Sequence, residues 1–242
     1  MKRGEMFSVA LVGPDGAGKT TLCRRLEESF PIPVKYIYMG VSTEASNVML
    51  PTTRLLRGLK RKLGVNTEQA GPPDSKQAKP PPQGVLKRFT STLKSSLRLI
   101  NQLSEEWYRQ FMAWNYQRRG TIVVFDRHFF TDYYAYDIQA GVTPKSLAQR
   151  IHGFMLTRLY PKPDLVVHLD APAAVLYDRK SEGTLEALEH RRQEYFQLKD
   201  SFDHFVTIDA SQSQEQVVQQ VFGLIYEFYQ TRSGSKIKVQ RA

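Results

Sequence analysis

Eight residues near the N-terminus have the composition of a phosphate-binding loop. They read Gly13-Pro14-Asp15-Gly16-Ala17-Gly18-Lys19-Thr20, which fits glycine, four residues and then Gly-Lys-Thr. Glycines let the backbone approach a polyphosphate, and the backbone N–H groups and helix N-terminus that follow supply partial positive charge. Lys19 would reach the terminal phosphates, and the Thr20 hydroxyl would hold Mg²⁺. The motif predicts that a nucleoside triphosphate binds at Gly13, Asp15, Gly16, Ala17, Gly18, Lys19, Thr20 and Thr21.

Two aspartates each follow an apolar segment further along the chain. Asp126 comes directly after residues 121–125, and Asp170 comes directly after residues 165–169. Either carboxylate would orient a magnesium ion or its water ligands. Capping of the next helix is the competing interpretation. The candidate metal ligands are therefore Thr20, Asp126 and Asp170.

Several basic residues are candidates for binding and stabilising phosphate groups. Arg127 suits bidentate binding of a second anionic group, such as an acceptor phosphate, with a structural ion pair as the alternative. His128 fits an orienting or packed role as well as a catalytic one. Arg179 and Arg192 belong to a segment that would close over the phosphates, although two solvated, charged helices explain them equally well. The catalytic candidates are Lys19, Asp126, Arg127, Arg179 and Arg192.

The elements that must position these residues follow from hydrophobic periodicity. The short apolar runs predict five strands, at 7–12, 34–39, 121–125, 165–169 and 205–208, of which those at 7–12 and 121–125 are expected to be buried. Helical spacing predicts helices at 19–30, 54–63, 86–114, 144–159, 185–199 and 217–229. Strands that alternate with helices indicate an α/β fold in which a five-stranded parallel sheet is covered on both faces. Sites in such sheets lie at the carboxyl ends of the strands, where the candidate residues fall.

Taken together, these residues resemble the thymidylate kinases, a family of P-loop nucleoside monophosphate kinases. The resemblance rests on the phosphate loop with Thr21, on Asp126-Arg127-His128 with Thr131, and on residues 163–170. It covers about 60% of the chain and implies a three-layer fold with ATP as the phosphoryl donor. It also implies that Asp15 contacts the sugar hydroxyl of the acceptor and that Arg127 contacts its phosphate. Some members carry a catalytic arginine at the position of Gly16, so its absence implies that Arg179 and Arg192 serve instead.

The acceptor side departs from the family pattern. Residues 38–43 read Tyr-Met-Gly-Val-Ser-Thr where the family shows an Arg-Glu and a Gly-Thr pair, and Ala135-Tyr136-Asp137 is displaced by one position from the family's Ala-Tyr-Gln. A nucleoside monophosphate such as dTMP is the first expectation for the acceptor. A sugar or another hydroxyl compound remains open, with Asp15 or Asp126 as the proton acceptor.

The chain of 242 residues has a formal net charge of +10, and the excess positive charge lies in two segments. Residues 54–98 contribute +9 and the stretch from Arg232 contributes +4, so the rest of the chain is slightly acidic. We therefore expect one P-loop domain over 1–231, with a basic insert at about 44–98 that is flexible at about 64–84, and a basic tail at 232–242. Leucines among the basic residues of 54–63 fit docking on an acidic membrane or a nucleic acid, or packing on the core.

Cysteine usage and hydropathy favour a reducing cytoplasm. Cys23 is the single cysteine, so no internal disulfide forms, and the sequence lacks a cysteine–histidine cluster of metal-ligand spacing. We expect neither a signal peptide nor a membrane-spanning segment, because the apolar runs are too short. The sequence leaves open whether the chain forms a homodimer. The function predicted is Mg-ATP-dependent phosphoryl transfer to a small phosphorylated acceptor, and the alternative from another class is an ATP-binding module docked on an anionic surface.

Overall fold

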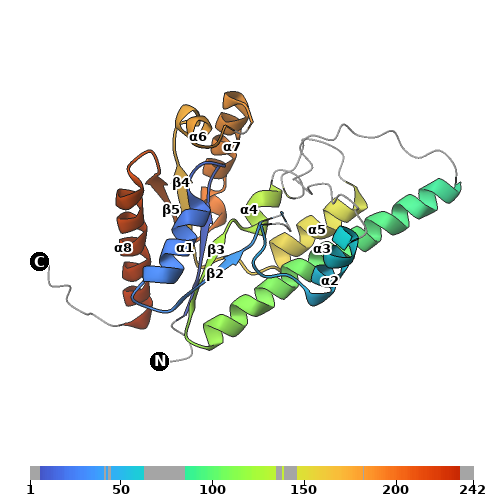
Figure 1. Cartoon of the computed structure of the whole chain (residues 1–242), viewed down its shortest axis with the longest axis horizontal. Coiled ribbons are helices and arrows are strands. Elements are labelled where there is room, and N and C mark those ends of the chain that lie inside the picture. The colour runs from blue at the N-terminus through green and yellow to red at the C-terminus, as the bar shows by residue number, and fades with distance from the viewer. Residues whose placement is uncertain are drawn as a thin grey trace, which may run out of the picture. The chain divides into compact units, whose positions relative to one another are not determined.

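The computed structural model describes residues 6–40, 42, 45–62, 85–134, 138, 146–181 and 183–234. These residues form two compact units. The first contains residues up to Ile37, then 113–128 and 162 onward, and the second contains 38–112 and 129–161. Figure 1 colours the elements along the chain.

The first unit is built on a five-stranded sheet in the order β2-β3-β1-β4-β5. Its strands are β1 (Ser8–Val12), β2 (Val34–Tyr38), β3 (Ile122–Asp126), β4 (Leu165–Asp170) and β5 (Phe205–Asp209). The central strand β1 pairs in parallel with β3, where Leu11 lies beside Asp126, and with β4, where Val12 lies beside His168. Every residue of β1 and β3 is buried, as expected for a parallel sheet covered on both faces.

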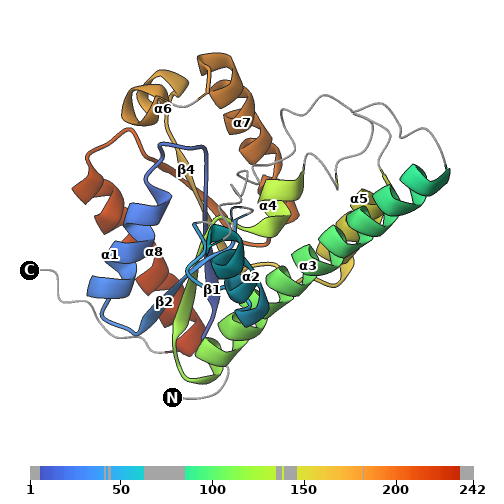
Figure 2. The same cartoon turned by 45° about the vertical axis from the view of Figure 1, so that its right-hand side comes forward.

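Helices of the first unit cover the sheet and extend beyond its carboxyl edge. Helix α1 (Lys19–Ser29) buries Leu22, Cys23 and Leu26 along one face, and it packs against α8 (Gln214–Ser233), as Figure 1 and Figure 2 both show. Helices α6 (Ala173–Lys180) and α7 (Leu185–Gln197) pack on each other beyond the end of β4, and a short 3-10 turn, η3 (Lys199–Ser201), leads from α7 to β5. The three-layer fold expected from the sequence is thereby confirmed.

The second unit is helical. It contains α2 (Pro51–Lys62), most of α3 (Val85–Arg118), the short α4 (Phe129–Tyr133) and α5 (Leu147–Arg158). A capping box at the start of α5 explains its first residue, because the Ser146 and Gln149 side chains each bond the other's backbone N–H. Among the residues that the structure describes, no helix is long and apolar enough to cross a bilayer.

The boundaries of several predicted elements shift by a few residues. The basic helix expected at 54–63 begins at Pro51, and the last helix begins at Gln214 and continues through Arg232 to Ser233. The spacing from Leu86 to Trp114 forms part of one 34-residue helix. The predicted flexible stretch 64–84 and the Ala135–Asp137 motif lie outside the described residues.

Candidate nucleotide-binding site

The predicted phosphate loop connects β1 to α1 at the carboxyl edge of the sheet. Gly18 immediately precedes the first residue of α1, in a left-handed conformation with φ 87°. Gly16 has nearly the same φ, 86°, and a Cβ added there would lie 2.7 Å from the carbonyl oxygen of Leu176 on α6. An arginine at this position, as in the thymidylate kinases that carry one there, would clash with that carbonyl. The close approach of the loop to α6 therefore requires glycine at residue 16.

Lys19 is buried and turned back onto the loop. Its ammonium donates to the carbonyl oxygens of Gly13, at 2.7 Å, and of Pro14, at 2.6 Å. A phosphate group is a stronger partner for an ammonium than a neutral carbonyl, so a bound polyphosphate would compete for this charge. The side chain that the sequence predicts to bind phosphate is thus held beside the loop backbone.

Thr20 and Asp126 meet, as their predicted shared role requires. The Thr20 hydroxyl donates to Oδ2 of Asp126 at 2.5 Å. Asp126 is 1% exposed, and its other oxygen, Oδ1, has no hydrogen-bond partner among the described residues. A buried carboxylate oxygen without a partner is costly unless a ligand satisfies it. This pair therefore fits a hard cation such as Mg²⁺, which takes one or two protein oxygens and completes its shell with phosphate and water.

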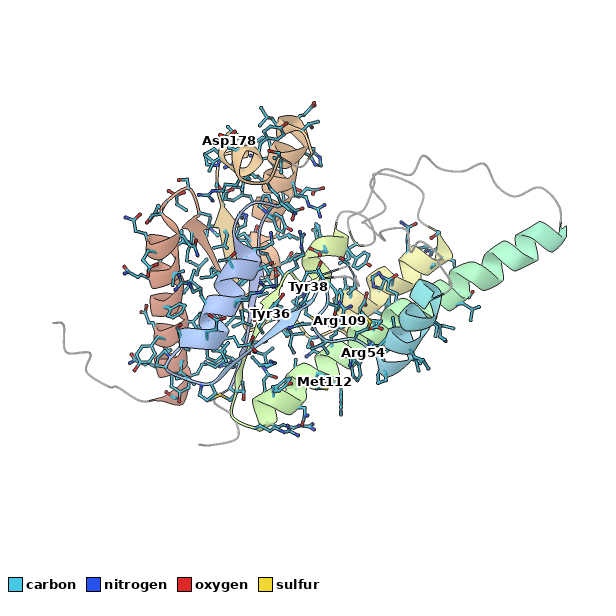
Figure 3. The ribbon with its side chains drawn as sticks, viewed as in Figure 1. Tyr36, Tyr38, Arg54, Arg109, Met112 and Asp178 are labelled. Carbon is cyan, nitrogen blue, oxygen red and sulfur yellow. The ribbon has the colours of Figure 1, made fainter. Side chains whose placement is uncertain are left out.

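Tyr36 is a site residue that sequence reasoning missed. Its hydroxyl, on β2, donates to Oδ2 of Asp126 at 3.4 Å (Figure 3 labels this tyrosine). Burial and the nearby Asp126 carboxylate raise the pKa of Tyr36, so the phenol stays protonated and remains a donor. A tyrosine in an apolar strand is usually interpreted as a core residue. Its proximity to Asp126 arises because β2 lies beside β3, and local sequence does not reveal that order of strands.

Asp15 and Arg127 form an ion pair at the front of the loop. The guanidinium donates to Oδ1 of Asp15, and the Lys180 ammonium lies 3.9 Å from the same oxygen. Burial raises the pKa of Asp15, but Arg127, Lys19 and Lys180 together outweigh burial, so the pKa lies below its usual value. The structure brings together the two residues to which the family resemblance assigns acceptor binding.

The backbone at Arg127 is itself unusual. Its φ of 68° lies in the left-handed region, and its N–H donates to the carbonyl oxygen of Leu11 at 3.0 Å. A non-glycine residue there costs about 1–2 kcal/mol, which the surrounding hydrogen bonds must offset. This turn directs the arginine side chain back toward Asp15. No sequence signal marks it, because glycine, asparagine or aspartate is the usual residue at positive φ.

A cavity of about 210 Å³ lies beside the phosphate loop in the first unit. Its wall includes Gly16, Ala17, Gly18 and Thr21 of the loop and α1, together with Leu169 and Arg179. The Arg179 guanidinium donates to the carbonyl oxygen of Ala210 at 2.7 Å, which ties α6 to the end of β5. Arg179 therefore lines a pocket wall, and its predicted catalytic role remains a prediction.

Arg192 and Asp170 bind each other. Nε and Nη2 of Arg192 donate to the two oxygens of Asp170, both at 2.8 Å, and Nη1 donates to Glu189 at 2.5 Å. The hydrogen bonds that Arg192 donates to Asp170, and then to Glu189, raise the pKa of its guanidinium despite partial burial. Because Arg192 engages both oxygens of Asp170, this ion pair joins α7 to β4. The sequence offered a solvated, charged helix as the alternative for Arg192, and its catalytic role remains a prediction.

Two histidines near the strand ends are buried and neutral. Burial lowers the pKa of His128 to about 3, and burial with nearby Arg192 and Lys19 lowers the pKa of His168 to about 4 although Asp170 opposes the shift. His168 packs among the rings of Tyr195, Phe196 and Phe205. The lowered pKa of His128 fits its orienting or packed interpretation better than a proton-transfer role near neutral pH.

The second unit contains a buried polar cluster of its own. Arg109, 2% exposed, donates to the carbonyl oxygen of Gly40 at 2.9 Å, and its guanidinium lies 5.4 Å from the ring centre of Phe129. Burial lowers the pKa of Arg109, although the neighbouring Glu105 carboxylate opposes the shift. Glu106, the residue after Glu105 on the same helix, binds His152, with 3.1 Å between its Oε1 and the imidazole Nε2. These residues were not singled out from the sequence, because polar positions on a long helix read as its solvent face.

The fold and the loop define a P-loop nucleotide-binding protein. The chain belongs to the AAA domain family, whose model matches residues 5–126, just over half of the chain. A search of curated protein sequences finds no match. Among solved structures, the chain is similar to a thymidylate kinase from Candida albicans, with a TM-score of 0.59, 15% identity and 93% of each chain covered. The resemblance to thymidylate kinases is therefore confirmed at the level of the fold.

Proposed function

We propose that the chain is a Mg-ATP-dependent kinase that transfers the terminal phosphoryl group to a small phosphorylated acceptor, first of all a nucleoside monophosphate. The observation that carries this proposal is the arrangement of Lys19, Thr20 and Asp126 around one phosphate loop. The thymidylate kinase fold supports a kinase within the wider class of P-loop proteins.

On the donor side, residues of the first unit would bind each part of Mg-ATP. The backbone N–H groups of the loop and Lys19 would hold the phosphates, and the cavity lined by Thr21, Leu169 and Arg179 would take the base. Thr20 and Asp126 would hold Mg²⁺, which supplies charge neutralisation between the phosphates when it is bound. The described residues contain no group of three or more acidic, histidine or cysteine side chains that would cage a metal. At phosphate sites Mg²⁺ usually takes one or two protein oxygens and is otherwise held by the nucleotide and water.

On the acceptor side, Arg127 is the group that would bind an anionic acceptor. Its guanidinium already neutralises one oxygen of Asp15, and a phosphate presents the same geometry with more charge. A phosphorylated acceptor arrives ionised, so transfer needs positioning and charge neutralisation rather than a strong base. The lowered pKa of Asp15 agrees, because a carboxylate of depressed pKa is a poor proton acceptor for a sugar hydroxyl.

The test is a transfer assay with ATP labelled in its terminal phosphate and a panel of acceptors. The panel contains dTMP, the other common nucleoside monophosphates and several sugars, each incubated with the full chain and Mg²⁺. We expect label in a nucleoside diphosphate, and loss of that product in Arg127→Asn, because asparagine accepts the left-handed backbone but lacks the charge. Label in a sugar would show the alternative kinase, and release of inorganic phosphate alone would show an ATPase.

A further inference from the structure

Helix α2 exposes two leucines, Leu55 and Leu59. The side chains of Leu55 and Leu59 are 66% and 49% exposed, and because they are four residues apart they share one helix face. Thr53 lies about 160° around the helix from Leu55 at 100° per residue, and its hydroxyl oxygen is buried. A surface helix of a globular protein normally does the reverse, with apolar residues inward and polar ones outward. The packing interpretation of these two leucines therefore fails.

The same helix is strongly basic. Its twelve residues include five lysines and arginines and no acidic residue, namely Arg54, Arg57, Lys60, Arg61 and Lys62. The side chain of Arg54 is exposed, and Figure 3 labels it on α2. The start of the helix is tied to α3, because the backbone N–H of Leu50 donates to Glu105 at 3.2 Å. An exposed leucine pair thus stands on a positively charged helix that is fixed at its first turn.

We propose that α2 docks the protein on an anionic phospholipid membrane. A helix that lies in the interface buries its apolar face at the boundary of headgroups and acyl chains, while lysine and arginine contact the lipid phosphates. A nucleic acid would neutralise the positive charges, but its phosphate backbone provides no apolar environment for the side chains of Leu55 and Leu59. The combination of exposed Leu55 and Leu59 with a helix that lacks acidic residues therefore favours lipid.

This docking is independent of the proposed kinase chemistry. α2 belongs to the second unit, whereas the phosphate loop, Asp126 and Arg127 belong to the first. Membrane binding would determine the location of the protein and would not alter its ATP-binding site. A variant of α2 should therefore lose membrane binding and keep nucleotide binding.

The experiment is co-sedimentation of the full chain with two kinds of vesicle. One kind is phosphatidylcholine alone, and the other contains about one third phosphatidylserine, a content at which the surface attracts basic segments. The test variant is Leu55→Glu with Leu59→Glu. The matched control is Leu147→Glu with Ile151→Glu, which places the same change on two exposed apolar residues four positions apart on α5. Circular dichroism and ATP binding establish that each variant is folded.

We expect the unaltered chain to bind the anionic vesicles, to dissociate from them at high salt, and not to bind the vesicles of phosphatidylcholine alone. The α2 variant should bind at least about 50-fold more weakly, since it loses apolar insertion and gains two negative charges, and the α5 variant should change less than about twofold. Equal binding by the α2 variant and the unaltered chain would overturn the proposal. Failure of the unaltered chain to bind anionic vesicles, or equal binding to both lipids, would overturn it as well.

Discussion

Replacing Gly16 with alanine should destabilise the protein more than the same change at Gly18. The two glycines have φ angles of 86° and 87°, so the left-handed strain of an alanine is the same at both positions. They differ in their surroundings. A Cβ at residue 16 would lie 2.7 Å from the Leu176 carbonyl oxygen, whereas a Cβ at residue 18 would have no atom of the described residues within 4 Å. The pair of variants separates steric contact from backbone strain.

The expected losses in the free energy of unfolding follow from the left-handed backbone strain and from the steric clash. Strain alone costs about 1–2 kcal/mol in either variant. The clash at residue 16 adds about 1–3 kcal/mol, because the obstacle is a helix backbone that can move only together with α6. The free energies of unfolding of the two variants should therefore differ by about 1–3 kcal/mol. With a urea dependence of about 3 kcal/mol per molar, the midpoints should differ by about 0.3–1 M.

Urea unfolding followed by circular dichroism measures both midpoints. The comparison needs equal slopes in the two transitions, so that a shifted midpoint reports stability alone. Equal midpoints for the Gly16 and Gly18 variants would refute the reasoning, because they would show that α6 does not approach the loop as the structure has it. A less stable Gly18 variant would refute it too.

Three further predictions concern pairs and buried groups. Asp170→Asn and Arg192→Gln should each lower the free energy of unfolding by about 1–3 kcal/mol, and a double-mutant cycle by urea unfolding should show that the losses do not add. His168 has a folded pKa of about 4 against 6.5 for the ordinary histidine, so the unfolded state binds the extra proton as pH falls below about 6.5. Stability should drop by about 1–2 kcal/mol between pH 6.5 and 5 on account of this residue, and His168→Gln should reduce that drop in urea titrations at the two pH values. Tyr36→Phe should weaken Mg²⁺-dependent ATP binding by less than about tenfold, measured by titration calorimetry, because it removes one long hydrogen bond to Asp126.

The parts of the fold that the sequence predicts well are those with a local physical signal. All five apolar runs correspond to strands of the sheet. The signal is clearest for the inner strands β1 and β3, because a parallel strand covered on both faces is apolar nearly throughout. The order of the glycines and Lys19 was enough to place the loop between a strand and a helix. Two helices begin at other residues than predicted, at Leu147 instead of 144 and at Gln214 instead of 217. Each is preceded by a capping box of serine with glutamine three residues later, a signal that would have located both starts.

The parts that could not be predicted depend on residues distant in sequence. The sequence makes Asp170 a metal candidate because it ends a strand, but it gives no sign of the hydrogen bonds from Arg192, which lies on a helix 22 residues further along. The clash that excludes a side chain at Gly16 comes from Leu176. The exposure of Leu55 and Leu59 on α2 could not be predicted either, because amphipathic spacing defines an apolar helix face but does not show whether that face is buried.

The most direct test of the nucleotide site is the affinity of the full chain for ATP with and without Mg²⁺, compared with Lys19→Ala. Lys19 makes charge-assisted bonds that phosphate would take over, so its removal should weaken Mg-ATP binding by about 10- to 100-fold. Circular dichroism should show the variant to be folded. Titration calorimetry that gives the same affinity for both proteins, or no ATP binding by the unaltered chain, would contradict the assignment of this loop as the phosphate site.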